Sequence, residues 1–409
     1  MVAAPRLRKK ENTTKADIKG EPFPSLHKAV AIYGPNASGK SSIVKALRLL
    51  QTLARREPSA EKRPLPVAPF KFDTKLLDKP SEFEVHFVES GRRYSLMLSL
   101  TSDRIHGEEL VEYIRGHSNT LYTRNYQDGH DIYRFGETLE GGATLHEAWR
   151  KLTSPQVMFL SQAVANSNEE LTQLRAPFKW LTELMVEEDG MRSNSKVTQR
   201  LIADLPSLGD TIAALLSDVD VPVTSIRTRV NDKQSHGSES SGEIFADVSE
   251  KNKALLKTVY NSSEVATTLT HKTSLGEAEF DISDESDGTK NLIGFAFPWL
   301  IFRQDEKNSR RRILVVDEID SSLHPKVVES LIRRHISSNS NCQLIFTTHD
   351  THLMDTKILR RDQIWLTERD DTGATQLRSV HDFSGRESED IEKRYYEGRY
   401  RGLPFLKGG

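Results

Sequence analysis

Gly34-Pro-Asn-Ala-Ser-Gly39-Lys40-Ser41 is the stretch that decides the fold of this chain. It fits the pattern G-x-x-x-x-G-K-[ST], whose glycines let the backbone curl until its N–H groups point at phosphate oxygens. A short apolar run at 29–33 precedes the stretch, and a helical pattern at 41–54 follows it. A strand, a phosphate loop and a helix in this order predict a nucleotide site at a positive helix end.

The side chains of this loop indicate which ligands it takes. The lysine after the second glycine reaches the β- and γ-phosphates, and the hydroxyl that follows it is a ligand of Mg²⁺. These roles fall on Lys40 and Ser41, so ATP and Mg²⁺ are the expected ligands. The residues that we predict to bind the nucleotide from this loop are Gly34, Asn36, Gly39, Lys40, Ser41 and Ser42.

Two carboxylates follow an apolar strand in the last third of the chain. The run Ile-Leu-Val-Val at 313–316 ends in Asp317 and Glu318, which is the Walker B form. We predict that Asp317 binds Mg²⁺, mostly through water, and that Glu318 is the general base that polarises the attacking water. The strand of this motif and the strand before the phosphate loop can then meet at one metal ion.

A histidine and a helix cap complete the set of candidate site residues. His349 closes the next apolar run, 344–347, so it is expected at the same carboxyl edge of the sheet, near a γ-phosphate. The predicted catalytic residues are therefore Lys40, Glu318 and His349. Ser286-Asp-Gly-Thr289 precedes a helix that starts near residue 290, where Ser286 can act as the N-cap and Gly288 frees the backbone for a phosphate.

Hydrophobic patterning divides the chain into three parts. Residues 1–160 hold the phosphate loop and, from 83 to 135, alternating residues that predict an antiparallel β meander. Residues 161–260 are predicted as an inserted helical lobe, helical at 163–217, with a strand at 221–230 and a mobile loop at 231–243. Residues 261–409 return to apolar strands alternating with helices, which predicts a parallel sheet covered on both faces.

Composition limits the classes of function. The 409 residues carry a formal net charge of −2, so nucleic-acid binding would need a local basic patch rather than a global field. The only cysteine, Cys342, excludes an intramolecular disulfide and is expected to be a buried apolar residue. No run approaches the roughly 18 apolar residues of a membrane span, so we expect a cytoplasmic protein with no membrane partner.

Taken together, these motifs resemble the ABC-type ATPases over residues 29–350. The fold class implied is α/β: an ABC-type P-loop ATPase head with an antiparallel β meander and an inserted helical lobe. In that family the signature of one subunit contacts the γ-phosphate held by another. The resemblance thus places Ser286, Gly288 and Thr289 in a nucleotide-sandwich dimer, identifies 319–325 as the D-loop, and identifies His349 as the switch histidine.

The same motifs, with the tail at 396–404, resemble the stand-alone ATPases of prokaryotic phage-defence and abortive-infection systems. These include the RloA and AbiL types and the AriA subunit of the PARIS system. The resemblance implies an ATPase sensor or scaffold that is a homo-oligomer of sandwich dimers. Its partners would be a separately encoded effector, such as a Toprim-type nuclease, and a phage protein as trigger.

Two departures and several alternatives accompany this resemblance. The segment 67–73 holds no Q-loop glutamine, and the opening lacks the family's first strand, so no adenine-stacking aromatic is assigned. The main alternative is an SMC-like DNA repair or recombination ATPase, although no long coiled coil is present. A fused Toprim nuclease would need a longer tail after His349, and a transporter ATPase would need the Q-loop.

Two basic clusters leave nucleic-acid binding open. The arginines at 310–312 precede an apolar strand, which favours a solvated lead-in. The tail interleaves basic and aromatic residues, a pattern that can bind nucleic acid, bind a partner protein or pack onto the ATPase. The tail residues concerned are Arg394, Arg399, Arg401, Tyr395, Tyr396 and Tyr400.

Overall fold

The computed structural model describes residues 1–400 except 17, 19, 21, 23–24, 58–62, 189–194, 220, 232–263, 308–310, 322, 340 and 388. The loop expected at 231–243 lies outside the described residues from 232 onward, and so do Arg310 and Arg401. No helix within the described ranges combines the length and apolar character that crossing a bilayer requires.

A six-stranded sheet forms the centre of the molecule, in the order β16-β15-β3-β14-β13-β9. All neighbours are parallel except the edge pair of β15 and β16. The strands are β3 (Ala29–Tyr33), β9 (Met185–Glu187), β13 (Ile313–Val316), β14 (Gln343–Thr347), β15 (Ile364–Arg369) and β16 (Thr375–Ser379).

The apolar runs form this sheet because both of its faces are buried. Successive side chains alternate between the faces, so Leu314 and Val316 join one hydrophobic core while Ile313 and Val315 join another. Cys342, just before β14, is fully buried as expected. The central sheet therefore separates two cores, and each core holds a different set of helices.

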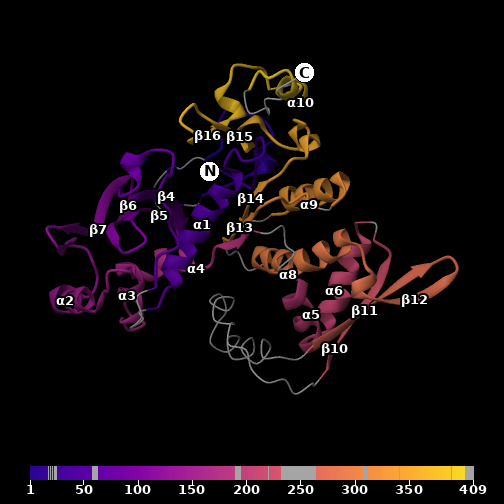
Figure 1. Ribbon diagram of the computed structural model, residues 1–409, viewed down its shortest axis with the longest axis horizontal. Helices are drawn as coiled ribbons and strands as arrows, with labels where there is room; N and C mark the ends of the chain where they lie inside the picture. Colours follow the sequence, from indigo (N-terminus) through magenta and orange to yellow (C-terminus); the bar gives the residue numbers. More distant parts are fainter. Residues whose placement is uncertain are drawn as a thin grey trace.

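Helices cover both faces of the sheet (Figure 1). The helix α1 (Lys40–Arg55) packs on the face that carries the meander core. The helices α8 (Asp287–Lys307) and α9 (Pro325–Ser337) pack on the other face. These bounds agree with the helices predicted after the phosphate loop, after Ser286 and after the Walker B strand.

The predicted meander is confirmed as a five-stranded antiparallel sheet in sequential order. Helices on its flank include α4, whose Trp180 stacks on Phe87 with ring centroids 4.1 Å apart. The strands are β4 (Ser81–Glu89), β5 (Arg92–Leu100), β6 (Ile105–Ile114), β7 (His117–Gln127) and β8 (His130–Phe135). The helices are α2 (Gly142–Leu152), α3 (Phe159–Ala165) and α4 (Arg175–Thr182).

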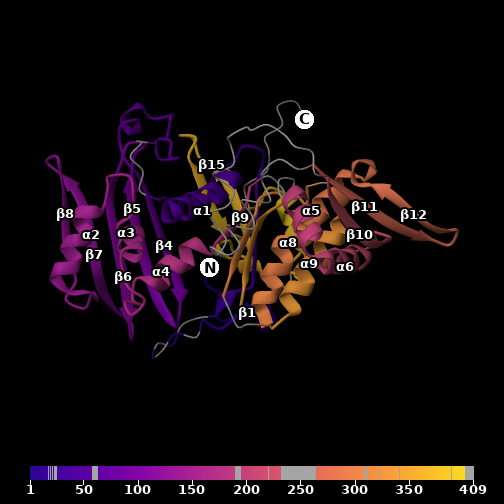
Figure 2. The same cartoon turned by 90° about the horizontal axis from the view of Figure 1, so that it is seen from below.

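The lobe predicted as helical is a mixed α/β unit instead. The stretch 163–217 is interrupted by β9, which joins the central sheet beside β13, and the helices beyond it pack on an antiparallel three-stranded sheet. Figure 2 shows this lobe and the meander on opposite sides of the central sheet. Its elements are α5 (Ser195–Asp204), α6 (Pro206–Ser217), β10 (Val223–Asn231), β11 (Glu264–Thr273) and β12 (Gly276–Asp281).

The two ends of the described chain pack against each other. The Asn12 side chain donates to Ile358 O at 2.9 Å and to Gln363 Oε1 at 2.7 Å, which ties the first residues to the segment before β15. The N-terminal elements are η1 (Lys10–Asn12), β1 (Thr13–Thr14) and β2 (Leu26–His27). The short helices elsewhere are η2 (Thr74–Leu76), η4 (Ile282–Asp284), η5 (Thr351–Met354), η6 (Arg361–Gln363), η7 (Val380–Asp382) and α10 (Ile391–Tyr396).

Candidate functional site

The phosphate loop connects β3 to α1 and depends on its two glycines. Gly34 has φ 152° and Gly39 has φ 104°, a region that L-residues with a side chain rarely adopt. A Cβ at Gly34 would lie 2.1 Å from Thr367 Oγ1, and one at Gly39 would lie 2.1 Å from Thr375 Oγ1. Conformation and space therefore both require glycine at these two positions.

Two threonines of the edge hairpin β15–β16 form hydrogen bonds with the phosphate loop and the strand before it. Thr367 Oγ1 donates to Tyr33 O at 3.0 Å and lies 2.5 Å from Ser38 Oγ. Thr375 Oγ1 donates to Ser38 O at 2.9 Å. The motif itself contains no sign of these contacts, because they come from residues that follow the loop by more than three hundred positions.

Lys40 is 7% exposed and folds back onto its own loop. Its ammonium donates to Gly34 O at 2.8 Å and to Pro35 O at 3.2 Å. Burial lowers the pKa of Lys40, and the nearby carboxylates of Glu318, Asp317 and Asp320 oppose that shift. The predicted phosphate-binding lysine and the Walker B carboxylates are thus brought close enough to interact.

Thr347, the last residue of β14, organises the Walker B pair. Its hydroxyl donates to Asp317 Oδ1 at 2.5 Å and accepts the backbone N–H of Glu318 at 2.7 Å. Asp317 is 5% exposed, whereas Glu318 is exposed and has φ 50°. A non-glycine residue held in a left-handed conformation costs about 1–3 kcal/mol, which is typical of functional positions.

His349 lies two residues beyond β14, as its spacing predicts. Its backbone N–H donates to Asp320 Oδ2 at 3.1 Å, so the D-loop and the histidine segment are joined. The other oxygen of Asp320 is buried and has no hydrogen-bond partner among the described residues. His349 also lines a hollow of about 160 Å³ together with Tyr33 and Gly34, which places it beside the first glycine of the phosphate loop.

Tyr395 and Tyr396 of the helix α10 also line this small hollow. Thr351, two residues after His349, donates to Glu392 Oε1 at 2.6 Å and lies 3.1 Å from Tyr396 Oη. Tyr395 and Tyr400 are buried in the main core. Of the three alternatives for the described part of the tail, packing onto the ATPase is the one the structure shows.

Several of the described basic residues in the two predicted clusters are held by acidic or carbonyl groups. Arg394 Nη2 lies 2.9 Å from Glu389, and Arg312 Nη2 lies 3.9 Å from Glu183. Arg311 donates to Lys15 O at 3.0 Å. These contacts agree with structural positions for the described arginines of both clusters.

The candidate signature begins α8. Ser286 Oγ accepts the backbone N–H of Thr289 at 3.1 Å, so the predicted N-cap is confirmed. Ser286 is exposed and Gly288 is half-buried. Within the described ranges, no hydrogen bond or ion pair joins these residues to the phosphate loop of the same chain, while Asn291 Nδ2 donates to Ser321 O of the D-loop at 3.1 Å.

The residues present suit a magnesium nucleotide. Ser41 is in the first turn of α1, and Asp317 ends β13 with one carboxylate oxygen engaged by Thr347. A hydroxyl and a carboxylate are oxygen donors of the kind that Mg²⁺ prefers when substrate phosphates and waters fill its other positions. The metal and nucleotide roles of the individual residues stay predictions.

A phosphate loop, a Walker B strand and a parallel central sheet define a P-loop ATPase domain with an ABC-type α/β fold. The family model described as "AAA domain, putative AbiEii toxin, Type IV TA system" matches residues 29–355. The chain belongs to this family of AAA domains. Among curated proteins, none matches the chain.

Among solved structures, heads of SMC proteins are similar at low sequence identity. The SMC head domain from Thermotoga maritima is 16% identical, with a TM-score of 0.36 over 90% of this chain and 96% of that chain. The Smc head domain with a coiled coil and joint from Pyrococcus yayanosii is 12% identical, with a TM-score of 0.38 over 93% and 98%. The family match and the strand order carry the fold assignment.

Proposed function

We propose that this protein hydrolyses ATP in the presence of Mg²⁺ and does so in a site shared by two copies. The observation that carries the proposal is the contact set around Thr347, whose hydroxyl binds both Asp317 and the Glu318 backbone. It holds in place two carboxylates whose charges act on the lysine of the phosphate loop. A nucleotide-binding loop alone would not need an exposed glutamate held in this way.

The chain's own residues divide the reaction as follows. Lys40 leaves the loop carbonyls and binds the β- and γ-phosphate oxygens, while the backbone N–H groups of the loop bind the others. Glu318, being exposed, accepts a hydrogen bond from the attacking water and orients it in line with the bond that breaks. His349 approaches the γ-phosphate from the same edge. Bound Mg²⁺ neutralises charge on the β- and γ-oxygens.

The second copy supplies the signature. Ser286 is exposed and Gly288 half-buried at the start of α8, and their N–H groups can receive a γ-phosphate held by a partner copy. A sandwich dimer of this kind makes ATP binding and pairing mutually dependent. It is also the unit from which a larger homo-oligomer could be built.

For the biological role, we propose a sensor or scaffold in anti-phage defence that holds a separately encoded effector, such as a Toprim-type nuclease, and releases it on a phage trigger. Support comes from the family's description, which names a toxin and a toxin–antitoxin system. The resemblance of the phosphate loop, signature, D-loop and histidine segment to stand-alone defence ATPases adds to it. ATP-dependent closure changes the fit of a bound partner by about 1–3 kcal/mol in typical couplings.

Two experiments test the ATPase activity and the defence role separately. Phosphate release by the purified chain, with Mg²⁺ and with EDTA, tests the ATPase: we expect slow turnover that EDTA removes, and turnover equal in both conditions would contradict it. For the defence role, two cell lines are challenged with phage and their plaques are counted. One carries the chain with its neighbouring gene, and the other carries the same genes with Lys40→Ala in the chain. Equal plaque counts across a phage panel would overturn the defence role and leave the ATPase result standing.

A further inference from the structure

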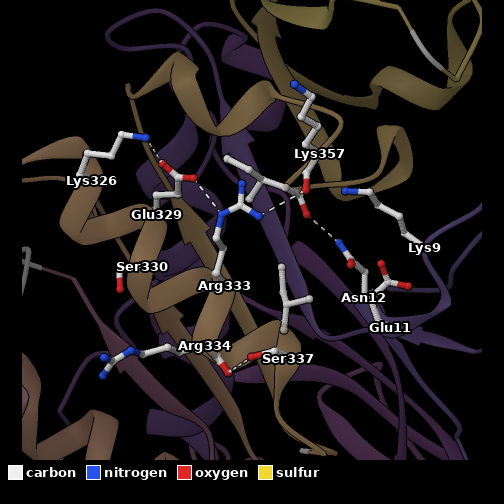
Figure 3. A pocket seen from close by; sticks show the side chains of 12 residues that line it. Lys9, Glu11, Asn12, Lys326, Glu329, Ser330, Arg333, Arg334, Ser337 and Lys357 are labelled. Carbon is white, nitrogen blue, oxygen red and sulfur yellow. Dashed lines mark hydrogen bonds and ion pairs between the residues drawn. The ribbon is translucent and has the colours of Figure 1, made fainter. Parts of the chain in front are cut away.

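A hollow of about 670 Å³ that shares no lining residue with the candidate nucleotide site lies between α9 and two other segments (Figure 3). One segment is N-terminal and includes η1, and the other precedes η6. Of its charged lining residues, five are basic and two are acidic. We name it the basic hollow; its charged residues are Lys9, Lys326, Arg333, Arg334, Lys357, Glu11 and Glu329.

The basic hollow has an excess of positive charge, although the chain as a whole has none. The formal net charge of the whole protein is −2, yet the lining carries three more basic than acidic side chains, since five minus two is three. The cations come from three segments that are far apart in sequence, around residues 9, 333 and 357. Figure 3 shows Lys9, Arg333 and Lys357 around the same hollow, whereas Arg334 points away from them.

Acidic residues neutralise only some of these cations, since Arg334 Nη1 lies 2.8 Å from Asp218 Oδ2. Glu329 is shared by Lys326 and Arg333, each with N···O 2.8 Å, so one carboxylate serves two cations. The ammonium groups of Lys9 and Lys357 have no hydrogen bond or ion pair among the described residues. Burial lowers the pKa of Lys9, and the Arg333 cation acts in the same direction, partly offset by Glu11 and Asp355. Cations held close together in this way create a positive potential that attracts an anion.

The lining also indicates what kind of anion fits. None of the described lining residues is aromatic, so the hollow offers no surface on which a base can stack, as single-strand sites do. The cations are accessible rather than enclosed: the side chains of Lys326 and Arg333 are 78% and 48% exposed. Three further basic residues of the N-terminal segment, Arg6, Arg8 and Lys10, are exposed, and Arg8 Nε lies 4.0 Å from Glu387. An extended, accessible row of cations suits a long polyanion better than a single phosphate.

We propose that the basic hollow binds the phosphate backbone of double-stranded nucleic acid without reading its sequence. Lys9, Arg333 and Lys357 contact successive phosphates, and the N-terminal arginines extend the contact along the strand. This inference goes beyond the proposed function and does not depend on ATP hydrolysis. The hollow is nevertheless placed to respond to nucleotide, because α9 begins immediately after the D-loop.

The test uses the full chain and a fluorescently labelled 30-base-pair duplex of arbitrary sequence, with binding measured by anisotropy over a series of salt concentrations. The site variant is Lys9→Gln/Lys357→Gln, which removes two cations and breaks no described side-chain contact. The matched control is Lys75→Gln/Lys79→Gln, which makes the same charge change at exposed positions before β4. Thermal unfolding of all three proteins checks that each is folded.

We expect the wild-type protein to bind duplexes of unrelated sequence equally, with affinity that falls steeply as salt rises. Each phosphate contact contributes about 0.9 to the slope of log K against log salt, so the site variant should lose about 1.8 from that slope and bind at least tenfold more weakly. The control should stay within about twofold of wild type, since it neutralises no cation of the hollow.

Three results would overturn the proposal. One is equal loss of affinity in the site variant and the control, which would mean diffuse attraction. Another is tighter binding to a single strand of the same length than to the duplex. The third is displacement of the duplex by poly-glutamate at matched charge concentration, which would assign the hollow to acidic protein instead of nucleic acid.

Discussion

The phosphate-loop half and the signature half of the proposed nucleotide site are built in opposite ways. Around the phosphate loop, β3, β14 and β15 contribute side chains that are buried and joined by hydrogen bonds across the sheet, such as Thr347 to Asp317 and Thr367 to Tyr33. Around the signature, the Ser286 hydroxyl bonds to Thr289, three residues away, and Ser286 remains exposed. The phosphate-loop half is held together by contacts within one chain, whereas the signature half is exposed to solvent.

This difference separates two kinds of function within one fold. Buried hydrogen bonds in a region of low dielectric are stronger and hold side chains in one geometry, which chemistry on a phosphate requires. An exposed helix start costs little to keep free and can bind and release a partner copy. Mutations in the two halves should therefore have different consequences, and the following experiments measure them in decreasing order of expected effect.

The largest effect is expected at the general base. Glu318→Gln keeps the shape of the side chain but removes the carboxylate that polarises water, so single-turnover hydrolysis should fall by about 10²–10⁴-fold while ATP still binds. Glu279→Gln on exposed β12 makes the same chemical change as a control and should leave the rate unaltered. Turnover of the Glu318 variant at the wild-type rate would remove the role we assign to it.

The next effect concerns the signature half. Gly288→Asp places a carboxylate where a partner's γ-phosphate approaches, which should lower hydrolysis by about 10–100-fold through repulsion of a few kcal/mol. ATP affinity, measured in dilute protein where single chains dominate, should change little. Gly288→Ala adds a side chain without charge, so activity in that variant together with loss in the aspartate variant would isolate the electrostatic cause. Equal rates in all three proteins would refute the shared site.

A smaller effect is expected from the packing of the phosphate loop. Gly39→Ala introduces a Cβ that would lie 2.1 Å from Thr375 Oγ1, at a φ of 104°. The conformational cost alone is about 1–2 kcal/mol, so ATP affinity should fall by about five- to thirtyfold. Adding Thr375→Ala, which deletes both the hydroxyl and the methyl group that crowd this Cβ, should recover little of the lost affinity. Full recovery would show that space, rather than conformation, is the constraint.

The smallest effects are expected on the free energy of unfolding, for which one substitution in each half is compared. Thr347→Val leaves Asp317 and the Glu318 N–H without their buried partner, which should lower the free energy of unfolding by about 1–3 kcal/mol. Ser286→Ala removes only a local helix cap and should cost about 1 kcal/mol or less. Urea denaturation measures both. A cap that costs more than the buried threonine would reverse the contrast between the halves.

The elements that could be predicted from sequence are those with a strong local pattern. The strand β13 was predicted at its observed bounds because four apolar residues end in two carboxylates, and the helix α1 within one residue at each end because a glycine precedes it. The strand β9 was missed because three residues are too few to show a period. With β9 unrecognised, the stretch 163–217 was predicted as helical throughout.

Side chains whose role arises from distant contacts could not be predicted. Thr347 and Thr367 are ordinary strand residues until the parallel register brings them to Asp317 and to the phosphate loop. The basic hollow gathers lysines and an arginine from three separate segments, none of which forms a basic run with the others. In contrast, Lys40, Asp317 and Glu318 follow motifs that already encode their positions, and the charges of both carboxylates act on Lys40 in the structure.

The strand order of the central sheet also determines when the protein can fold during synthesis. Thr367 and Tyr33, which meet between β15 and β3, are 334 residues apart, whereas every strand of the meander pairs with the next one in sequence. The meander can therefore form while the chain is still on the ribosome, but β3 must wait for β14 and β15 to emerge. Until then an apolar strand and an open phosphate loop stay unpaired. Pulse-labelled hydrogen exchange during refolding should accordingly protect β5–β7 before β3, and the reverse order would contradict this sequence of events.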